Sequence, residues 1–458
     1  MKRFFSLLLI ITLILTICPN IGIADTARQS GDFFYKIKGN GTAAITGYNW
    51  ANYHNGDIYI PRMLDGYTVT EIGEEAFTRL QYDENGVIKS TYHTTVESIT
   101  IPDTVLYIGE KAFMGTRFEK SSITIPASVQ YIGAGAFSNL AGIERFVVDE
   151  GNPVYATING ALYYKQRKEL VAYPASPKLM SYDGTGYRWS ISIPEGIISI
   201  GDYAMFGIGD VSNSYSLIYR LPSSLKHIGD YAFAHNPGFA MMVDSMSKSE
   251  TLRLPDELET IGIGAFYDMG GAIREEVDLS NTKITEIPEL AFYGLSVSGK
   301  IVFPEGLIRI GDKAFKNGFQ SMILKRGSYQ HISQDFPSSL QYIGNEAFAY
   351  FQFGDAFGLK YLTNLIAIGD SAFEGCSSTS TSLTLPDNLE TIGTKAFLNC
   401  AKLKTITIPA SVLEIGDNMC NRNSVYLDVT VGTYAALWAS ENGYMTNQAG
   451  QEDTSWLD

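Results

Sequence analysis

The chain has 458 residues, 45% of which are hydrophobic, and it carries a formal net charge of −15 at pH 7. This apolar content is ample for a buried core, and the length alone would predict two or three globular domains. The negative charge argues against nucleic acid or an anionic membrane as a partner, because phosphate groups are bound by clusters of lysine and arginine.

The first residues have the pattern of an export signal. Lys2 and Arg3 precede an uncharged apolar run over residues 4–17, and Gly22 and Ala24 are small enough for the positions that a signal peptidase recognises. We therefore expect residues 1–24 to be a cleaved signal peptide, and losing Lys2 and Arg3 changes the net charge from −15 to −17. An uncleaved membrane anchor is the alternative, although the run is short for a complete span. The mature chain is expected to be secreted or to lie at the cell surface, without membrane insertion.

One hexapeptide recurs along the rest of the chain and begins with Ile at twelve positions. The copies are IGEEAF at residue 72, IGEKAF at 108, IGAGAF at 132, IGDYAM at 200, IGDYAF at 228, IGIGAF at 261, IPELAF at 287, IGDKAF at 310, IGNEAF at 343, IGDSAF at 368, IGTKAF at 392 and IGDNMC at 415. The smallest spacing between copies is 23 to 24 residues. A period in this range predicts a solenoid, in which each repeat is one coil stacked on the next.

Each coil is expected to contain two extended walls. Nine copies have Pro six residues before the Ile, preceded by an alternating segment such as SITIP or TITIP, and this alternation predicts a short strand with one buried face. Gly at the second position of the hexapeptide permits a tight corner or a positive φ. Ala at the fifth position and Phe at the sixth are expected to be buried between coils. Asp in several copies, such as Asp202 and Asp312, is expected to cap the N-terminus of a single helical turn.

These repeats resemble those of the BspA-like leucine-rich-repeat proteins, which are bacterial secreted and surface proteins with the approximate repeat LxxIxIPxxVxxIGxxAFxxC. One unit matches this pattern at Leu403, Ile406, Ile408, Pro409, Val412, Ile415 and Gly416. The resemblance implies a curved leucine-rich-repeat solenoid of about twelve repeats, mostly β with short helical turns, and with a parallel sheet on its concave face.

The repeats and the resemblance also divide the chain into parts. The solenoid is expected to span residues 25–425, with a first-unit cap at 31–77 that looks like the usual first unit of the family. Residues 146–174 resemble a hairpin-bearing insertion common in the family, with Asn159-Gly160 at its turn. Residues 426–458 are expected to form a C-terminal cap and a polar tail.

Motifs that carry catalytic or metal chemistry are missing from the sequence. The five histidines are scattered over different units, and no metalloprotease, nucleophile-elbow, Walker or EF-hand motif is present. Three cysteines follow the expected signal peptide without metal-ligand spacing. Cys376 and Cys400 lie at equivalent positions of adjacent units, so a disulfide between them is geometrically conceivable, and small buried wall residues are the alternative. We expect no enzyme activity, no cofactor and no metal site.

Function is therefore expected on the surface of the solenoid. The residue two positions before each Pro alternates with buried ones and is expected on the concave sheet. This column is Thr100, Thr124, Ser192, Arg220, Arg253, Val302, Asp335, Lys360, Thr384 and Thr407, where Lys360 is aligned through its IG because Leu362 replaces the Pro. The charged residues at the centre of this column are a candidate contact for a protein ligand, namely Arg220, Arg253, Asp335 and Lys360. The alternative is that these are solvated strand residues without a binding role. Phe351 and Phe353 in an insertion are candidate aromatic anchors, and the alternative is that they cover coil edges.

The resemblance implies adhesion, in which the solenoid binds a protein ligand such as a host extracellular-matrix protein or a protein on another cell. Two other classes of function stay open. The 28 tyrosines suggest a module that binds carbohydrate or cell wall, and a structural component of a surface layer is the third class. Nucleic acid is not expected as a partner.

Overall fold

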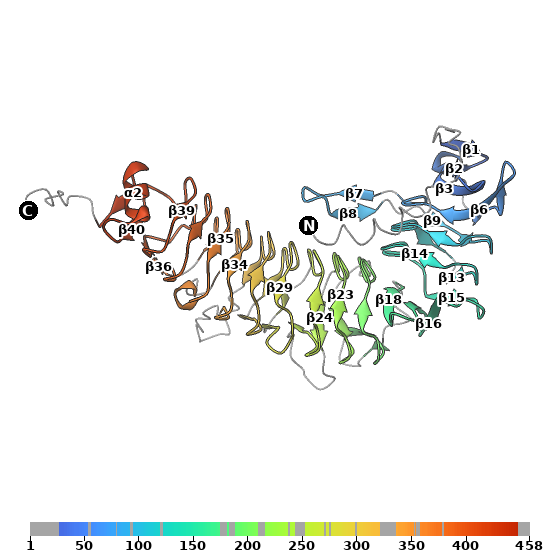
Figure 1. Ribbon diagram of the computed structural model, residues 1–458. Coiled ribbons are helices and arrows are strands. Elements are labelled where there is room, and N and C mark those ends of the chain that lie inside the picture. Colours follow the sequence, from blue (N-terminus) through green and yellow to red (C-terminus); the bar gives the residue numbers. More distant parts are fainter. Residues whose placement is uncertain are drawn as a thin grey trace, which may run out of the picture.

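The computed structural model describes residues 27–447 except 54–55, 79, 92–94, 120–121, 175–180, 183–187, 209–215, 237–238, 243–251, 270–271, 274–275, 298–299, 321–335, 352, 354–357 and 378–379. The chain forms one curved stack of coils (Figure 1). Almost every strand pairs in parallel with a strand of the next coil, so the predicted solenoid is confirmed. The expected signal peptide lies outside the described residues.

The first wall of each coil is a strand that ends at the Ile of the hexapeptide, and we call these the isoleucine strands. They are β6 (Tyr67–Ile72), β11 (Tyr107–Ile108), β14 (Tyr131–Ile132), β21 (Ser199–Ile200), β23 (His227–Ile228), β26 (Thr260–Ile261), β29 (Glu286–Ile287), β32 (Arg309–Ile310), β34 (Tyr342–Ile343), β35 (Ala367–Ile368), β37 (Thr391–Ile392) and β39 (Glu414–Ile415). Within each sheet the Ile of one strand stands opposite the Ile of the next, as Ile108 does with Ile132. The isoleucines thus form buried columns, which are interrupted between β14 and β21 and between β26 and β29.

The second wall is built from the segments that lead up to the prolines and, in coils without that Pro, from the strands in the equivalent position of the same wall; we call these the outer strands. They are β4 (Asp57–Tyr59), β10 (Ser98–Thr100), β13 (Ser122–Ile125), β15 (Arg145–Val148), β20 (Arg188–Ser192), β22 (Ser216–Arg220), β24 (Phe239–Met242), β25 (Leu252–Arg253), β28 (Glu276–Asp278), β31 (Lys300–Val302), β36 (Ser382–Thr384), β38 (Thr405–Ile408), β40 (Tyr426–Val429) and β41 (Met445–Thr446). Their residues alternate between buried and accessible, as in β13 and β38, which follows from the two-residue period of a strand.

The remaining elements are short or lie at the ends. Additional two-residue strands are β9 (Thr95–Val96), β12 (Arg117–Phe118), β19 (Ser181–Tyr182), β27 (Ala272–Ile273), β30 (Ser296–Val297) and β33 (Phe319–Gln320). Two 3-10 turns are η1 (Trp50–Asn52) and η3 (Leu359–Tyr361). An antiparallel ribbon of β1 (Arg28–Ser30), β2 (Phe33–Ile37) and β3 (Thr42–Tyr48) covers the first coil, and β5 (Met63–Leu64) pairs with β6. The last coil is covered by α2 (Tyr434–Glu441), whose Trp438 stacks on Tyr444 with ring centroids 5.0 Å apart.

Two hairpins depart from the coil plan. β16 (Tyr155–Ile158) and β17 (Ala161–Tyr164) pair antiparallel across Asn159 and Gly160, which have φ values of 51° and 81°, and β18 (Glu169–Ala172) leads the chain back into the isoleucine strands. The second hairpin, β7 (Leu80–Tyr82) and β8 (Ile88–Thr91), leaves the first coil. In Figure 1 it reaches into the hollow of the arc.

The turn after each isoleucine strand differs from the expected helical turn. The fourth residue of the hexapeptide has a positive φ in all twelve copies, between 52° and 67°, although it is Gly only at positions 135 and 264. The expected N-terminal cap is also wrong: the Asp202 carboxylate accepts the backbone N–H of Asp230 in the next coil at 2.7 Å, and Asp230 accepts from Ile263 at 2.7 Å. The Asp side chains thus connect neighbouring coils by hydrogen bonds. The chain direction reverses at the fourth residue of the hexapeptide, because that residue has the left-handed backbone conformation.

Close approach between coils explains the Gly at the second position of the hexapeptide. A Cβ atom on Gly262 would lie 2.4 Å from the backbone of Gly229 and Asp230 in the preceding coil. The positive φ expected at this Gly is wrong, because it falls two residues later. The close approach of the preceding coil, which was expected only at the Ala position, is what requires Gly here. Pro288 occupies this position in one copy and has no N–H to donate, and the sheet of isoleucine strands is interrupted there between β26 and β29.

The core is a set of parallel side-chain columns. Phenylalanines at the sixth position stack face to face, with ring centroids 5.0 Å apart for Phe266 and Phe292 and 5.2 Å apart for Phe292 and Phe315. The buried side chains form two large clusters, one from Tyr35 to Ala172 and one from Ala161 to Tyr444. They meet at the β16–β18 insertion, where Figure 1 shows the direction of the stack changing.

Candidate functional site

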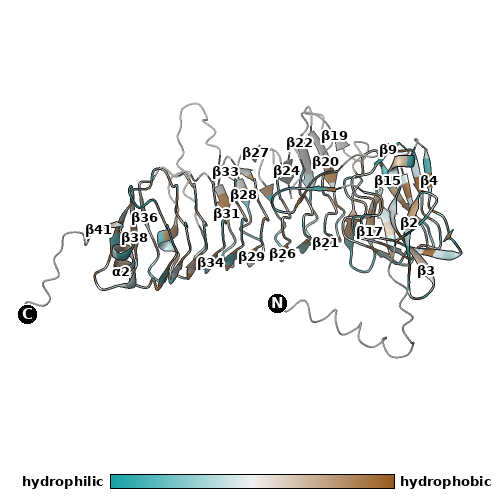
Figure 2. Cartoon of the chain, turned by 90° about the horizontal axis from the view of Figure 1, so that it is seen from above, coloured by the Kyte–Doolittle hydropathy of each residue, from teal (hydrophilic) through white to brown (hydrophobic). Residues whose placement is uncertain are grey.

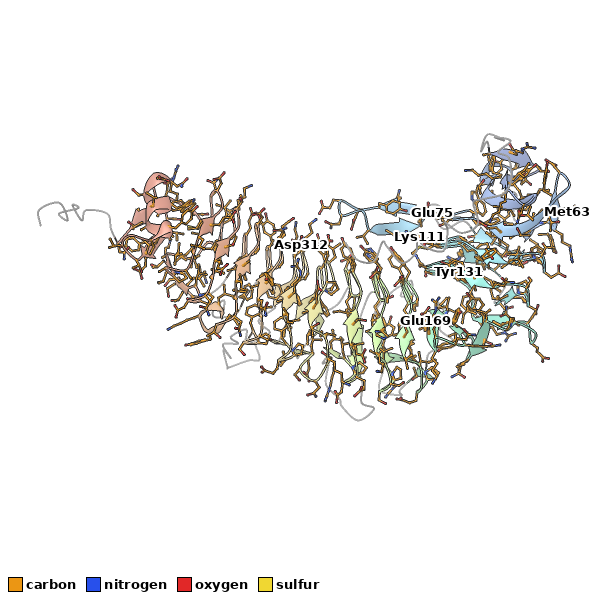
Figure 3. The ribbon with its side chains drawn as sticks, in the orientation of Figure 1. Met63, Glu75, Lys111, Tyr131, Glu169 and Asp312 are labelled. Carbon is orange, nitrogen blue, oxygen red and sulfur yellow. The ribbon has the colours of Figure 1, made fainter. Side chains whose placement is uncertain are left out.

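The inner face of the arc is formed by the turns that follow the isoleucine strands. Figure 3 shows the turn residues Glu75, Lys111 and Asp312 along the hollow side of the arc, and Figure 2 shows the isoleucine strands and the outer strands on opposite long sides. The expectation that the strands before the prolines line the concave face is therefore wrong. Gly at the start of these turns lets neighbouring coils approach closely on this side.

Tyrosines gather on the inner face at the middle of the arc. The rings of Tyr203 and Tyr231 stack with centroids 5.2 Å apart, and those of Tyr267 and Tyr293 with centroids 4.7 Å apart. Burial raises the pKa of Tyr231 to about 12. Burial and a hydrogen bond to Asp83 also raise the pKa of Tyr267 far above its ordinary range, so the phenols of Tyr231 and Tyr267 are neutral at physiological pH.

The predicted charged column lies on the outer strands and is discontinuous. Arg220 ends β22 and stands opposite Met242 of β24, and Arg253 lies on β25, in a different sheet. Because β24 pairs with β22, the two arginines are not on neighbouring strands. Arg253 is exposed and faces Asp278 and Asp256 at 3.9 and 3.6 Å. The two arginines are thus accessible, but the structure does not bring them together.

The other predicted contact residues separate into three groups. Asp335 lies outside the described residues. Lys360 is exposed on η3 rather than on a strand, with Nζ 5.7 Å from the centre of the Tyr361 ring. Phe351 and Phe353 are buried, at 1% and 5% exposure. They are therefore not surface anchors, because the insertion folds back and packs both rings against Phe348 of the aromatic column.

An open groove of about 800 Å³ follows the isoleucine strands on one long side of the solenoid. Its charged lining is Arg167, Glu169, Asp202, His227, Asp230, Glu259 and Glu286. Glu169 is labelled in Figure 3 near the start of this wall, and burial raises the pKa of its carboxyl group. A second groove of about 480 Å³ continues along the same strands from Arg309 to Gly416, with Asp312, Asp370 and Glu414 in its lining. Carboxylates outnumber cations in both grooves.

Ion pairs stabilise part of this groove wall. Lys226 Nζ lies 2.8 Å from Glu259 Oε1, and hydrogen bonding to Lys226 holds the pKa of Glu259 below its ordinary value. Arg309 Nε lies 3.4 Å from Glu286 Oε1 in the next coil. These side chains are 40 to 56% exposed, so the pairs stay accessible to a partner and are screened by salt.

The structure offers little for chemistry within the described residues. No group of three or more possible metal ligands occurs there. Cys376, Cys400 and Cys420 are free and buried, and the first two donate to the carbonyl oxygens of Phe348 and Phe373 at 2.9 and 3.1 Å, so the conceivable disulfide is not formed. None of the helices in the described part of the chain has the length and apolar character needed to cross a lipid bilayer.

One structural feature has no signal in the sequence, namely the contact between the β7–β8 hairpin and the middle of the arc. Asn85 Nδ2 donates to the hydroxyl of Tyr267 at 3.1 Å, across 182 residues of sequence. The sequence of residues 78–95 does not predict this contact, because local composition does not indicate where an inserted loop docks.

The chain was compared with protein families, curated proteins and solved structures. The family model described as the BspA type leucine rich repeat region matches residues 89–168, 181–243, 221–326 and 325–432, in six copies. Among curated proteins, none matches this chain.

Several solved structures are similar to the chain over most of their length. The pneumococcal vaccine antigen PcpA is 16% identical, with 92% of this chain and 98% of that chain covered and a TM-score of 0.32. A leucine rich cell surface protein from Faecalibacterium prausnitzii is 19% identical, with the same coverage and a TM-score of 0.39. A leucine-rich repeat protein from Eubacterium ventriosum is 17% identical, with 77% and 94% covered and a TM-score of 0.42.

Proposed function

This chain belongs to the BspA-type leucine-rich-repeat family, and from this membership and its surface we propose that it is a secreted or cell-surface protein that binds a protein ligand and has no enzymatic activity. Leucine-rich-repeat solenoids generally bind other proteins along an extended face. Export is supported by the expected signal peptide at residues 1–24. Adhesion to a host extracellular-matrix protein or to a protein of another cell is the specific form of this proposal.

The observation that carries the proposal is the long acidic groove along the isoleucine strands. It crosses several coils and is open along its length, which suits an extended macromolecule better than a small substrate. Glu169, Glu259 and Glu286 in its lining favour a ligand segment rich in lysine or arginine, because complementary charge speeds encounter and selects the partner. The ligand is therefore a protein with an accessible basic segment.

The test is a binding assay with the chain lacking residues 1–24. The protein is immobilised and exposed to basic and neutral extracellular-matrix proteins, and in parallel to an array of polysaccharides. Saturable binding to a basic protein that weakens as salt rises is the expected result. Binding to polysaccharide alone, or self-assembly without either kind of ligand, would replace this proposal with one of the two other classes.

Charge-neutral variants locate the contact. The double substitution Glu259→Gln and Glu286→Gln should weaken binding to the basic protein about twofold to thirtyfold, since an exposed ion pair contributes about 0.2 to 1 kcal/mol and two are removed. The matched control, Glu305→Gln with Asp387→Asn, removes two exposed acids elsewhere on the coils. If both pairs of substitutions weaken binding equally, net charge rather than the groove is responsible.

The outer strands remain a second proposed contact for the same ligand. Arg220→Glu with Arg253→Glu tests this surface, and Lys404→Glu on a terminal coil is the control. If the outer surface carries the contact, the double reversal slows association while the control leaves it unchanged. If the groove carries it, the reversal leaves binding unchanged or speeds association with a basic ligand.

A further inference from the structure

The β7–β8 hairpin is docked on the rest of the described molecule by side chains and not by a shared sheet. In the described residues β7 pairs with β8 alone, with Leu80 opposite Thr91 and Tyr82 opposite Ile88. The β16–β18 hairpin is different, because β18 continues into the isoleucine strands through β21. A two-stranded hairpin is marginally stable by itself, so the β7–β8 hairpin depends on the surface beneath it.

That surface is apolar. Val87 and Ile88 of the hairpin form a separate buried cluster with residues of the inner face that come from five coils. We call these residues the inner patch: Met114, Phe206, Ala234, Tyr267 and Leu290. Each is at most 3% exposed, although the positions lie on the outside of the coils. The inner patch would be uncovered if the hairpin lifted, and an exposed apolar patch of this kind on a solenoid is an interaction site.

The tip of the hairpin is matched to polar groups around the patch. One carboxylate oxygen of Asp83 accepts the backbone N–H groups of Asn85 and Val87 at 2.8 and 3.0 Å, which shapes the turn. The other accepts the Tyr267 hydroxyl proton. Asn85 also accepts from Lys313 Nζ at 3.3 Å. A carboxylate and an amide at the turn, followed by two aliphatic residues, is therefore the pattern that the inner face recognises.

We propose that the inner patch is a docking surface for a β-hairpin of a partner protein with this same pattern, and that the β7–β8 hairpin is its intramolecular competitor. The tethered hairpin holds the surface closed, because tethering gives it an effective concentration of about millimolar. A partner gains access when its own hairpin displaces it. This site is separate from the acidic groove, and its test needs no external ligand, so its failure leaves the proposed function intact.

The probe is a fluorescent, head-to-tail cyclised peptide with the sequence of residues 80–91, LQYDENGVIKST. Its binding is measured by fluorescence anisotropy with the wild-type chain and with a variant in which residues 79–94 are replaced by a short Gly-Ser linker. The expected result is saturable binding to the variant that is at least about tenfold tighter than to the wild-type chain, where the tethered hairpin competes. Adding Tyr267→Ala to the variant should abolish that gain.

A point variant keeps the test valid if the deletion variant does not fold. Ile88→Asp in the full chain places a charge against the inner patch and should lift the hairpin, so peptide binding appears and trypsin cleaves faster after Lys89. Ile158→Asp is the matched control, because Ile158 is 39% exposed on the other hairpin, and it should change neither readout. The proposal is overturned if a correctly folded deletion or Ile88→Asp variant binds the peptide no better than the wild-type chain. It is also overturned if Tyr267→Ala leaves the peptide affinity unchanged.

Discussion

Truncating one ring of the aromatic column should destabilise the solenoid strongly. Phe315 is fully buried, lies between Phe292 and Phe348 with centroids 5.2 Å away on each side, and meets the edges of Phe303 and Phe351. Buried Phe→Ala changes cost about 3 to 5 kcal/mol, and each well-placed aromatic pair adds about 0.5 to 1.5 kcal/mol beyond its buried area. The measured cost of a buried Phe→Ala change already includes its lost ring contacts, so we expect Phe315→Ala to lie in the upper part of the range of about 3 to 5 kcal/mol.

Urea denaturation followed by circular dichroism and by tyrosine fluorescence measures this loss. Leu413→Ala is the control, because Leu413 is an aliphatic side chain four coils away that is 68% exposed, and its truncation should cost less than about 0.5 kcal/mol. Solenoids can unfold in parts, so the two signals are compared for coincident transitions. Equal losses for the two variants, or a loss below about 2 kcal/mol for Phe315→Ala, would refute the assignment of this column as the source of stability.

Three further predictions concern packing, thiols and pH. Gly262→Ala should cost about 1 to 3 kcal/mol by overpacking, whereas Gly306→Ala, where an added Cβ meets nothing within 4 Å, should be neutral in the same thermal melt. The three cysteines that follow the expected signal peptide should react with a thiol reagent at pH 8 only as fast as the protein unfolds locally. Burial makes them inaccessible and raises the pKa of Cys400 to about 12. Immediate reaction of the folded protein would contradict this. Burial raises the pKa of Tyr231 to about 12, so the folded state holds this proton more tightly than the unfolded chain. The resulting contribution to stability is fully present below about pH 10 and should be lost between about pH 10 and 12. Denaturation midpoints that stay constant over this range would count against it.

The regular part of the fold could be predicted from the sequence because equivalent positions of the hexapeptide carry the same type of side chain in nearly every coil. Ile228, Ala232 and Phe233 are all buried, as their places in the hexapeptide predict. Twelve phased copies allow little other than stacked coils, since a single coil buries no core. The accessible alternate residues of the outer strands, such as Arg253, follow from the same period.

The departures come from contacts that leave no local pattern. Tyr203 and Lys313 carry positive φ values of 57° and 56°, and neither residue type signals a left-handed turn. Phe351 was a candidate surface residue because it lies in an insertion, but the insertion folds back onto the core. The hairpin docks on Tyr267, far away in the sequence, and only the curvature of the whole stack brings them together.

The covered ends of the stack have a consequence for the association of this protein with other chains. Parallel coils leave a bare strand edge at each terminus, and such an edge recruits further chains. Here β1–β3 cover one end, and α2 with β41 covers the other, with Ala435, Trp438 and Ala439 buried against the last coil. A protease that cut between residues 429 and 434 would remove α2 and β41 and leave the edge of β40 free to pair with a strand of another chain. We expect such trimming to convert a discrete protein into one that associates with further chains through this strand edge.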